Sequence, residues 1–262
     1  MSVRARVAGA LVLAALALPA RADDAVPLSS GDVAARWHTR LSNRHFNATV
    51  RMRMDLGGLH EERILRVYRD DEGGRNERVL IRFDAPADLR NVGLLYLEQV
   101  GRPNDYFLYQ PAVKRIRRLP QSIADDDVYG IDLEFLGFGV AQSAPTEIAG
   151  MTRETLAGRA VYRLDERASV PNPRFETRRT WIDAQSFIPM RTEHLRAERV
   201  VLRAETLEVL EVQGIPTPKR MRFHKPIEQR EVLVDVDAVD YQAPIADEHF
   251  SALALLKSQA PK

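Results

Sequence analysis

The chain has 262 residues, with 38 lysines and arginines, 37 aspartates and glutamates, and a formal net charge of +1. Because it contains no cysteine, the composition excludes a disulfide scaffold, a thiolate metal site, a catalytic thiol and a lipidated N-terminal cysteine. This length is enough for one large β domain or two small domains, and either would have a core that needs no staple.

The first 22 residues have the pattern of a secretory signal peptide. Arg4 and Arg6 are basic, residues 7–18 are uncharged and mostly apolar, and Ala20-Arg21-Ala22 is a cleavage site of the A-x-A type. An apolar run of about 12 residues is too short to cross a bilayer core of about 30 Å. We therefore expect cleavage after Ala22 and a mature chain, residues 23–262, in the periplasm; an uncleaved membrane anchor is the alternative.

Removal of the signal peptide takes away three arginines and no acidic residue, which leaves a mature net charge of −2. Nucleic-acid binding draws most of its affinity from the neutralisation of phosphates by basic side chains. The charge balance therefore argues against nucleic acid as a partner.

The first predicted element of the mature chain is a short amphipathic helix over residues 32–41. Val33, Ala34, Trp37 and Leu41 recur at helical spacing. A serine or an aspartate at positions 29, 30 and 32 is available to cap its N-terminus.

After this helix the period of the apolar residues changes to two, which predicts strands bounded by Gly, Pro, Asn or Asp. About a dozen strands result, with a less regular stretch at residues 121–150 and a C-terminal helix over residues 247–258. So many strands at roughly ten-residue intervals favour a mainly β fold, namely one large antiparallel sheet that curves into an incomplete barrel. The predicted strands are residues 50–55, 64–69, 79–83, 92–97, 106–109, 113–119, 159–166, 175–182, 188–194, 199–212, 219–224 and 231–239.

Most of these strands alternate apolar and charged residues, which predicts one wet face and one apolar face. With few helices to cover it, the apolar face either fills its own interior or leaves a hollow for an apolar ligand. Taken singly, each residue fits an ordinary core position, and the ligand hypothesis concerns the whole set. The residues that we expect to line this apolar cavity are Met52, Met54, Leu65, Val67, Ile81, Phe83, Leu95, Leu97, Leu108, Met221 and Phe223.

Residues 125–139 alternate acidic and bulky apolar residues and contain several glycines. Phe135, Leu136 and Phe138 lie among glycines that permit hinge motion, so this stretch has the composition of a mobile lid. A plain loop packed on the edge of the sheet would look similar, and the sequence does not separate the two.

Four basic residues fall within five positions: Lys114, Arg115, Arg117 and Arg118. In an exported protein such a cluster could dock an acidic partner or anionic lipid head groups. A solvated strand face is the alternative.

Common catalytic and metal-binding motifs are absent from the sequence. The zinc-protease pattern that starts at His60 has Ile64 where a second histidine is required, and the calcium-loop pattern at Asp125 has Tyr129 and Leu136 at ligand positions. We therefore predict no catalytic residue, no metal site and no cofactor, and we expect a protein that is not an enzyme.

Four stretches resemble the LolA/LolB-like periplasmic carriers, the outer-membrane lipoprotein-sorting proteins. They are residues 78–96, the Tyr106-Phe107-Leu108-Tyr109-Gln110-Pro111-Ala112 strand with its basic end at 114–118, the acidic–aromatic segment 132–136, and Trp181-Ile182-Asp183 followed by residues 188–191. Segment 132–136 departs from the usual order of the family, so no residue role is transferred there.

The resemblance implies a single domain over residues 23–262, an incomplete antiparallel β-barrel whose apolar concavity is closed by helical lid segments. It also implies a carrier that binds the acyl chains of a lipoprotein or a lipid and shuttles them toward the outer membrane. An inner-membrane transporter of the resistance–nodulation–division type and an outer-membrane acceptor would be its partners.

Two other function classes remain open. A lipid-sensing regulatory or interaction module of the cell envelope would use the same cavity, but sensors similar to this fold usually carry a second small domain. A hydrolase would need a clustered acid, base or nucleophile, and no spacing in the sequence shows one.

Overall fold

The computed structural model describes residues 27–42, 44–71, 77–120, 127–129, 131–132 and 145–256. The predicted signal peptide, residues 1–22, lies outside these ranges. So do the predicted lid residues Phe135, Leu136 and Phe138. Cleavage of the signal peptide and the lid role of these three residues therefore stay predictions.

One antiparallel sheet of thirteen strands makes up most of the described chain, in the order β6-β5-β4-β3-β2-β1-β15-β14-β13-β12-β11-β10-β9. Consecutive strands pair within each of two halves, β1–β6 and β9–β15, and the pairing of β1 with β15 joins the halves. The two end strands, β6 and β9, do not pair with each other, so the sheet is open. The predicted incomplete antiparallel barrel is confirmed. The strands are β1 (Phe46–Leu56), β2 (His60–Asp70), β3 (Arg78–Ala85), β4 (Gly93–Leu97), β5 (Asp105–Gln110), β6 (Arg115–Leu119), β9 (Thr146–Leu156), β10 (Arg159–Ala168), β11 (Thr177–Asp183), β12 (Pro189–Arg196), β13 (Arg199–Val212), β14 (Ile215–Lys225) and β15 (Arg230–Asp240).

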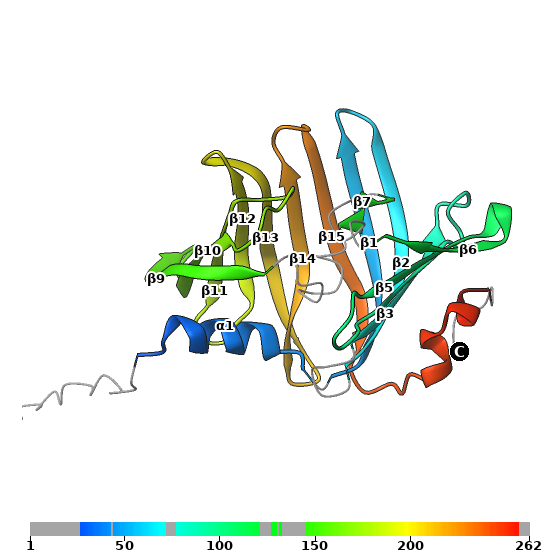
Figure 1. Cartoon of the computed structure of the whole chain (residues 1–262), viewed down its shortest axis with the longest axis horizontal. Coiled ribbons are helices and arrows are strands. Elements are labelled where there is room, and N and C mark those ends of the chain that lie inside the picture. Colours follow the sequence, from blue (N-terminus) through cyan, green and yellow to red (C-terminus); the bar gives the residue numbers. More distant parts are fainter. Residues whose placement is uncertain are drawn as a thin grey trace, which may run out of the picture.

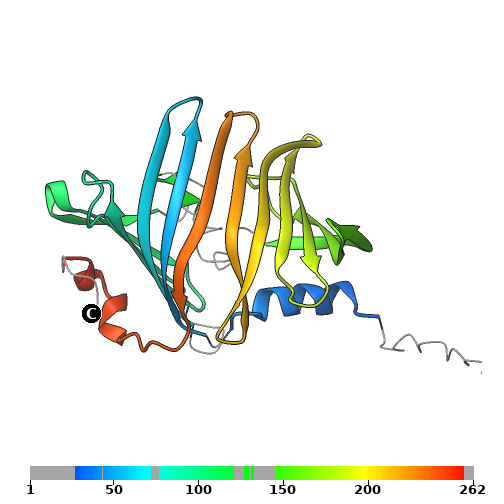
Figure 2. The same ribbon diagram turned by 180° about the vertical axis from the view of Figure 1, so that it is seen from behind.

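The sheet curves strongly, and Figure 1 looks into its hollow side. The long strands β1, β2, β14 and β15 stand upright in the middle, and both ends of the sheet bend forward. Figure 2 shows the opposite, outer side, with the central strands in front. The curvature follows from the right-handed twist of the strands and from register shifts such as the one between Thr49 and Val50.

Helix α1 (Ser30–Thr39) confirms the predicted N-terminal helix, which begins two residues earlier than expected. Ser29 is its N-cap: the Ser29 Oγ accepts from the backbone N–H of Asp32 at 3.1 Å, and the Asp32 carboxylate accepts from the Ser29 N–H at 3.0 Å. This reciprocal pair is a capping box, which satisfies backbone donors that the first turn leaves open.

Strand β9 and the small hairpin of β7 (Asp127–Val128) and β8 (Ile131–Asp132) were not predicted from the sequence. Strand β9 lies at the end of the sheet and most of its residues are at least partly exposed. Its partly buried and exposed residues do not alternate regularly, so the pattern that reveals the other strands is missing.

The predicted C-terminal helix is wrong in type. The chain forms two short 3₁₀ segments, η3 (Asp247–Phe250) and η4 (Ala252–Leu256), separated by Ser251 in an extended conformation. The Ser251 Oγ accepts from the Ala254 N–H at 3.1 Å and so caps the start of the second segment. This new start at Ser251 prevents one continuous helix.

The apolar side chains form three clusters. The largest lies on the hollow side of strands β1–β5, β14 and β15. A second lies on the opposite side of β2–β5 beneath η3 and η4, and a third lies where α1 packs against β10 and β11. The core is therefore spread along the sheet on both of its faces.

Candidate ligand-binding face

We define the concave face as the sheet face that carries the largest apolar cluster. Register places its members in rows, because directly opposite residues of an antiparallel pair share a face. One row runs Met54, Val232 and Phe223 across β1, β15 and β14, and the next runs Met52, Val234 and Met221. On β2 these two rows meet Glu61 and Arg63, and the apolar surface continues in the neighbouring rows. There Val50 is opposite Leu65, which is opposite Phe83, and Ala48 is opposite Val67, which is opposite Ile81. The result is a continuous apolar surface across five strands.

The predicted cavity residues divide between the two faces. Met52, Met54, Leu65, Val67, Ile81, Phe83, Leu108, Met221 and Phe223 all belong to the concave cluster. The prediction placed Leu95 and Leu97 there too, and that placement is wrong. Leu95 is opposite Leu80, and Leu95 and Leu97 both pack in the outer cluster beneath the C-terminal segment. Leu94 and Tyr96 take the concave positions instead.

The error has a simple physical cause. Strand β4 is Gly-Leu-Leu-Tyr-Leu and is buried on both faces, so it has no alternation that could reveal which leucine points inward. Only pairing with β3, where Ile81 is opposite Leu94, settles the face. Leu94 and Tyr96 were missed for the same reason, and no signal within the strand could have found them.

Described elements cover the concave face in two places. Toward β9 and β10, helix α1 packs Val33 and Trp37 against Leu164 and Ile182. Toward β3, the ring of Tyr129, which follows β7, meets the ring of Phe83 edge-on with centroids 5.8 Å apart. Figure 1 shows the β7–β8 hairpin on this side of the sheet. Tyr129 therefore belongs to a segment that lies over the apolar surface.

Tyr129 is held by a strand of the sheet as well as by packing. The side-chain amide of Gln110, the last residue of β5, donates to the Tyr129 Oη at 2.8 Å. Tyr129 has a positive φ of 53°, which is uncommon for a residue other than glycine and fixes the end of β7 in a tight turn. Of the stretch predicted to cover the cavity, the structure describes residues 127–129 and 131–132, and Tyr129 contacts the concave cluster.

The charged groups on the concave face beneath α1 are paired. The Arg178 guanidinium donates to both carboxylate oxygens of Glu166, at 2.9 and 2.8 Å, and lies 5.3 Å from the centre of the Trp37 ring. Burial raises the pKa of Glu166, but the hydrogen bonds and positive charge of Arg178, together with the hydrogen bond from Thr146 and the charge of His38, outweigh it and lower the pKa of this carboxyl. A pair of this kind keeps the interior free of net charge.

His194 lies close to this pair and is almost fully buried. Its ring packs against Phe175 with centroids 4.5 Å apart. Burial, assisted by the positive charges of Arg174 and Arg178, holds the pKa of His194 well below its ordinary value. The imidazole is therefore neutral at neutral pH, and this part of the face stays uncharged.

The four basic residues predicted to form a docking cluster do not share one face. Arg117 is opposite Leu108 and Arg115 is opposite Gln110, which places both on the concave side of β6. Arg118 is opposite Phe107 on the outer side, where its guanidinium pairs with Asp105. Lys114 ends a short 3₁₀ turn, η1 (Pro111–Val113), with a φ of 48°. The run in the sequence is thus divided between two sides of the sheet.

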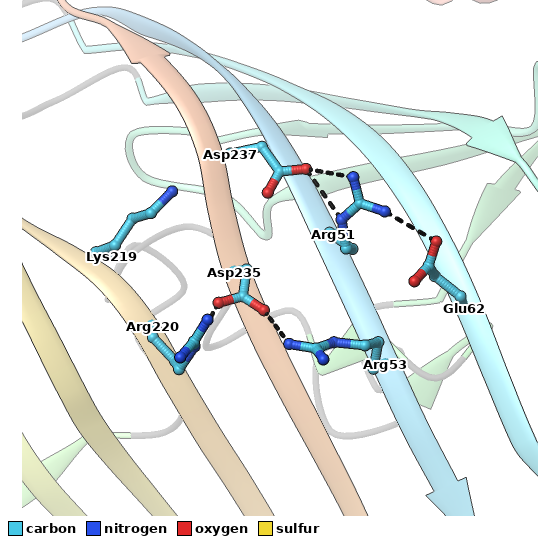
Figure 3. A pocket seen from close by; sticks show the side chains of 7 residues that line it. All are labelled: Arg51, Arg53, Glu62, Lys219, Arg220, Asp235 and Asp237. Atoms are coloured by element: carbon cyan, nitrogen blue, oxygen red, sulfur yellow. Dashed lines mark hydrogen bonds and ion pairs between the residues drawn. The ribbon is translucent and has the colours of Figure 1, made fainter.

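The outer face carries a polar pocket over β1, β2, β14 and β15, which Figure 3 shows from close by. Arg51 pairs with Glu62 and with Asp237, both at 3.0 Å. Arg53 and Arg220 pair with Asp235, both at 2.5 Å. These charges neutralise one another, so the predicted wet face is a ladder of ion pairs and not a site of one sign.

In the described ranges, no group of three or more His, Cys, Asp or Glu side chains is arranged to hold a metal ion. Within the same residues, no helix has the length and apolar character needed to cross a membrane. The concave face offers mainly apolar surface, and the chemistry that it supports is the binding of an apolar group.

We compared the sequence of the chain with protein families and with curated proteins. A family model with the description "Uncharacterized protein" matches residues 75–257. No curated protein is significantly similar to the chain in sequence.

Several solved structures are similar to the chain in fold. A DUF1329 family protein from Desulfovibrio piger has a TM-score of 0.75 at 21% identity, over 86% of this chain and 97% of that chain. An outer membrane lipoprotein-sorting protein domain from Vibrio parahaemolyticus has a TM-score of 0.77 at 15% identity, over 87% and 100%. A LolA superfamily protein from Nitrosomonas europaea has a TM-score of 0.62 at 14% identity, over 86% and 98%.

Proposed function

From the premise that this chain belongs to the family whose model matches residues 75–257 and has a LolA-like fold, we propose that it is a carrier of lipid or lipidated protein. The observation that carries the proposal is the concave face: an open sheet whose hollow side is apolar across β1–β5, β14 and β15. An acyl chain bound there would itself be removed from water, which is favourable by about 25 cal/mol per Å² of its apolar surface.

The proposal includes the expected location and partners. A carrier that is exported through a signal peptide works in the periplasm, takes its cargo from an inner-membrane transporter of the resistance–nodulation–division type and delivers it to an outer-membrane acceptor. It performs no reaction on the cargo. The paired charges beneath α1 support this view, because Glu166 and Arg178 are held by each other and not aimed at a substrate.

The absence of cysteine from the chain allows a direct test. Phe223 and Arg222 are neighbours on β14 that point to opposite faces: Phe223 packs on the concave cluster, whereas the Arg222 guanidinium pairs with Glu205 on the outer face at 2.6 Å. Phe223→Cys and Arg222→Cys variants of the mature protein would each carry a single thiol. The measurement is the rate of alkylation by iodoacetamide, with and without a neutral acyl ligand such as monoolein.

We expect monoolein to slow alkylation at position 223 several-fold and to leave position 222 unchanged, because only the first thiol lies where the acyl chain binds. Equal rates with and without ligand at both positions would refute the proposal. Mass spectrometry of organic extracts from the natively purified protein then identifies the cargo.

A further inference from the structure

Two arginines at the rim of the concave face differ from the paired arginines of the outer face. On the outer face, Arg51, Arg53 and Arg220 each have carboxylate partners within 3.0 Å. Arg115 and Arg117 on β6 are exposed, and neither has an acidic partner within the described part of the chain. No carboxylate of the described ranges therefore neutralises their positive charge.

Register fixes where these two charges lie relative to the apolar surface. Arg117 is directly opposite Leu108, a member of the concave cluster, and Leu119, two residues further along β6, packs against the same cluster. Residues i and i+2 of a strand point to the same face and lie about 7 Å apart. Arg115 and Arg117 thus stand side by side at the border of the apolar face.

The position of β6 in the sheet leaves this border open. Strand β6 is the last strand at its end of the sheet, and its far edge pairs with no other described strand. A group bound by Arg115 and Arg117 can therefore stay in contact with water while an attached chain extends over Leu108. Guanidinium groups suit this task because they bind phosphate, sulfate or carboxylate oxygens through two parallel hydrogen bonds.

We propose that Arg115 and Arg117 form an anionic head-group site at the rim of the concave face. The cargo is accordingly an anionic amphiphile, whose acyl chain lies on the concave cluster and whose phosphate, sulfate or carboxylate group binds the two guanidinium groups. This inference rests on the proposed carrier function and names the class of cargo. It also reassigns two residues of the sequence-predicted docking cluster from partner docking to cargo binding.

The chain offers a matched control for the test. Arg118 is the neighbour of Arg117 on β6, is also exposed and carries the same charge, but it lies on the outer side, where it pairs with Asp105. Arg117→Gln and Arg118→Gln therefore make the same chemical change on opposite faces. The probes are dihexanoyl phosphatidylglycerol and dihexanoyl phosphatidylcholine at concentrations at which both are monomeric, each measured by displacement of a neutral fluorescent acyl probe.

For the full mature protein we expect tighter binding of the anionic lipid, dihexanoyl phosphatidylglycerol, than of the choline lipid, dihexanoyl phosphatidylcholine. Arg117→Gln should weaken binding of the anionic lipid about tenfold, as expected for the loss of one charge-assisted hydrogen bond. It should weaken binding of the choline lipid less, because the ammonium group of that lipid already balances its phosphate, and it should leave the neutral probe unchanged. Arg118→Gln should change none of the three. Combining Arg115→Gln with Arg117→Gln should abolish the preference for the anionic lipid.

Equal effects of Arg117→Gln and Arg118→Gln, or no preference of the wild type for the anionic lipid, would overturn the proposal. Flotation with phosphatidylglycerol vesicles tests whether the two arginines bind the head groups of a membrane surface and not those of single cargo molecules. Arg117-dependent binding to vesicles, together with no preference among the monomeric lipids, would make these arginines a membrane-docking surface and refute the head-group site. Failure of the neutral acyl probe to bind would instead refute the carrier function itself.

Discussion

The side chain of Leu255 packs directly on the backbone of Gly93. A Cβ atom at position 93 would lie 2.8 Å from the Leu255 Cδ2 and 3.6 Å from the Arg82 Nη1. Leu255 is completely buried, and the Arg82 guanidinium donates to the Ala254 carbonyl and, at 3.4 Å, to the Leu255 carbonyl. Through these contacts the C-terminal segment is fixed to the outer side of β3 and β4.

We expect Gly93→Ala to destabilise the protein by about 1–3 kcal/mol, the usual cost of an added methyl group in a filled site. Leu255→Ala should cost about 2–5 kcal/mol through the cavity that it leaves. In the double variant the penalty of Gly93→Ala should disappear, because the Cδ2 that it meets is gone. Urea unfolding of the four proteins measures the coupling, and strictly additive free energies would contradict this close approach.

The buried carboxyl of Glu77 should make the free energy of unfolding depend on pH. Burial, assisted by the negative charges of Asp71 and Glu98, raises the pKa of Glu77 from 4.5 to about 8, although Arg69 donates to its carboxylate and opposes the rise. A carboxyl with a raised pKa stays protonated in the folded state while the unfolded chain ionises. Its stabilising contribution is complete below about pH 4.5 and is lost as the pH rises to about 8.

Glu77→Gln, which cannot ionise, isolates this effect from that of the buried His194, whose depressed pKa acts in the opposite direction. We expect the variant to gain stability relative to wild type as the pH rises from about 5 to 8, by at most about 1.4 kcal/mol per pH unit. Urea unfolding at four pH values provides the measurement. A variant that instead loses relative stability over this range would show that Glu77 is ionised and bound to Arg69.

Asp235 should be the most important carboxylate of the outer ion-pair ladder. It is 7% exposed and accepts from Arg53 and Arg220 at 2.5 Å each, whereas Asp237 is 34% exposed and, within the described ranges, pairs with Arg51 alone. Burial acts to raise the pKa of Asp235, but the hydrogen bonds from Arg220 and Arg53 outweigh it and lower the pKa below 3.8. The stabilisation is therefore complete above the unfolded-state pKa of 3.8, and it is lost as the pH falls through the lower pKa that Asp235 has in the folded state.

We expect Asp235→Asn to cost about 1–3 kcal/mol at pH 7 and Asp237→Asn, the control, less than about 1 kcal/mol. The difference between wild type and Asp235→Asn should shrink below about pH 4, where wild-type Asp235 is neutral in the unfolded chain. Equal costs at the two positions would mean that the second arginine contributes nothing.

The predicted lid can be tested although its residues lie outside the described ranges. Changing Phe135, Leu136 and Phe138 together to Ser should weaken binding of a fluorescent acyl probe at least tenfold. If each side chain buries on the order of 100 Å² against cargo, the loss is roughly 2–3 kcal/mol apiece, while tenfold needs only about 1.4 kcal/mol. The melting temperature should change little, because a mobile lid contributes little to global stability.

Ile227→Ser is the control for this variant, because Ile227 is apolar and 71% exposed at the turn between β14 and β15. It should change neither affinity nor melting temperature. A large fall in melting temperature for the triple variant, with unchanged affinity per folded molecule, would show that Phe135, Leu136 and Phe138 are ordinary core.

The sequence alone determined the fold class, because alternation of period two and turns of the Asp55–Gly58 kind depend only on neighbouring residues. The Asp55 carboxylate accepts from the Gly58 N–H at 2.8 Å and the two glycines have positive φ angles, as that turn requires. The helix at Val33–Trp37 and the concave placement of most of the predicted cavity residues followed from the same local periodicity.

Tertiary structure decided what local pattern could not. Strand β4 is apolar at consecutive positions, so only pairing with β3 placed Leu94 inward and Leu95 outward. Strand β9 is an edge strand without alternation, and pairing with β10 alone revealed it. Register likewise divided Arg117 from Arg118, because strand neighbours point to opposite faces and a run of charges in the sequence need not be one surface in space.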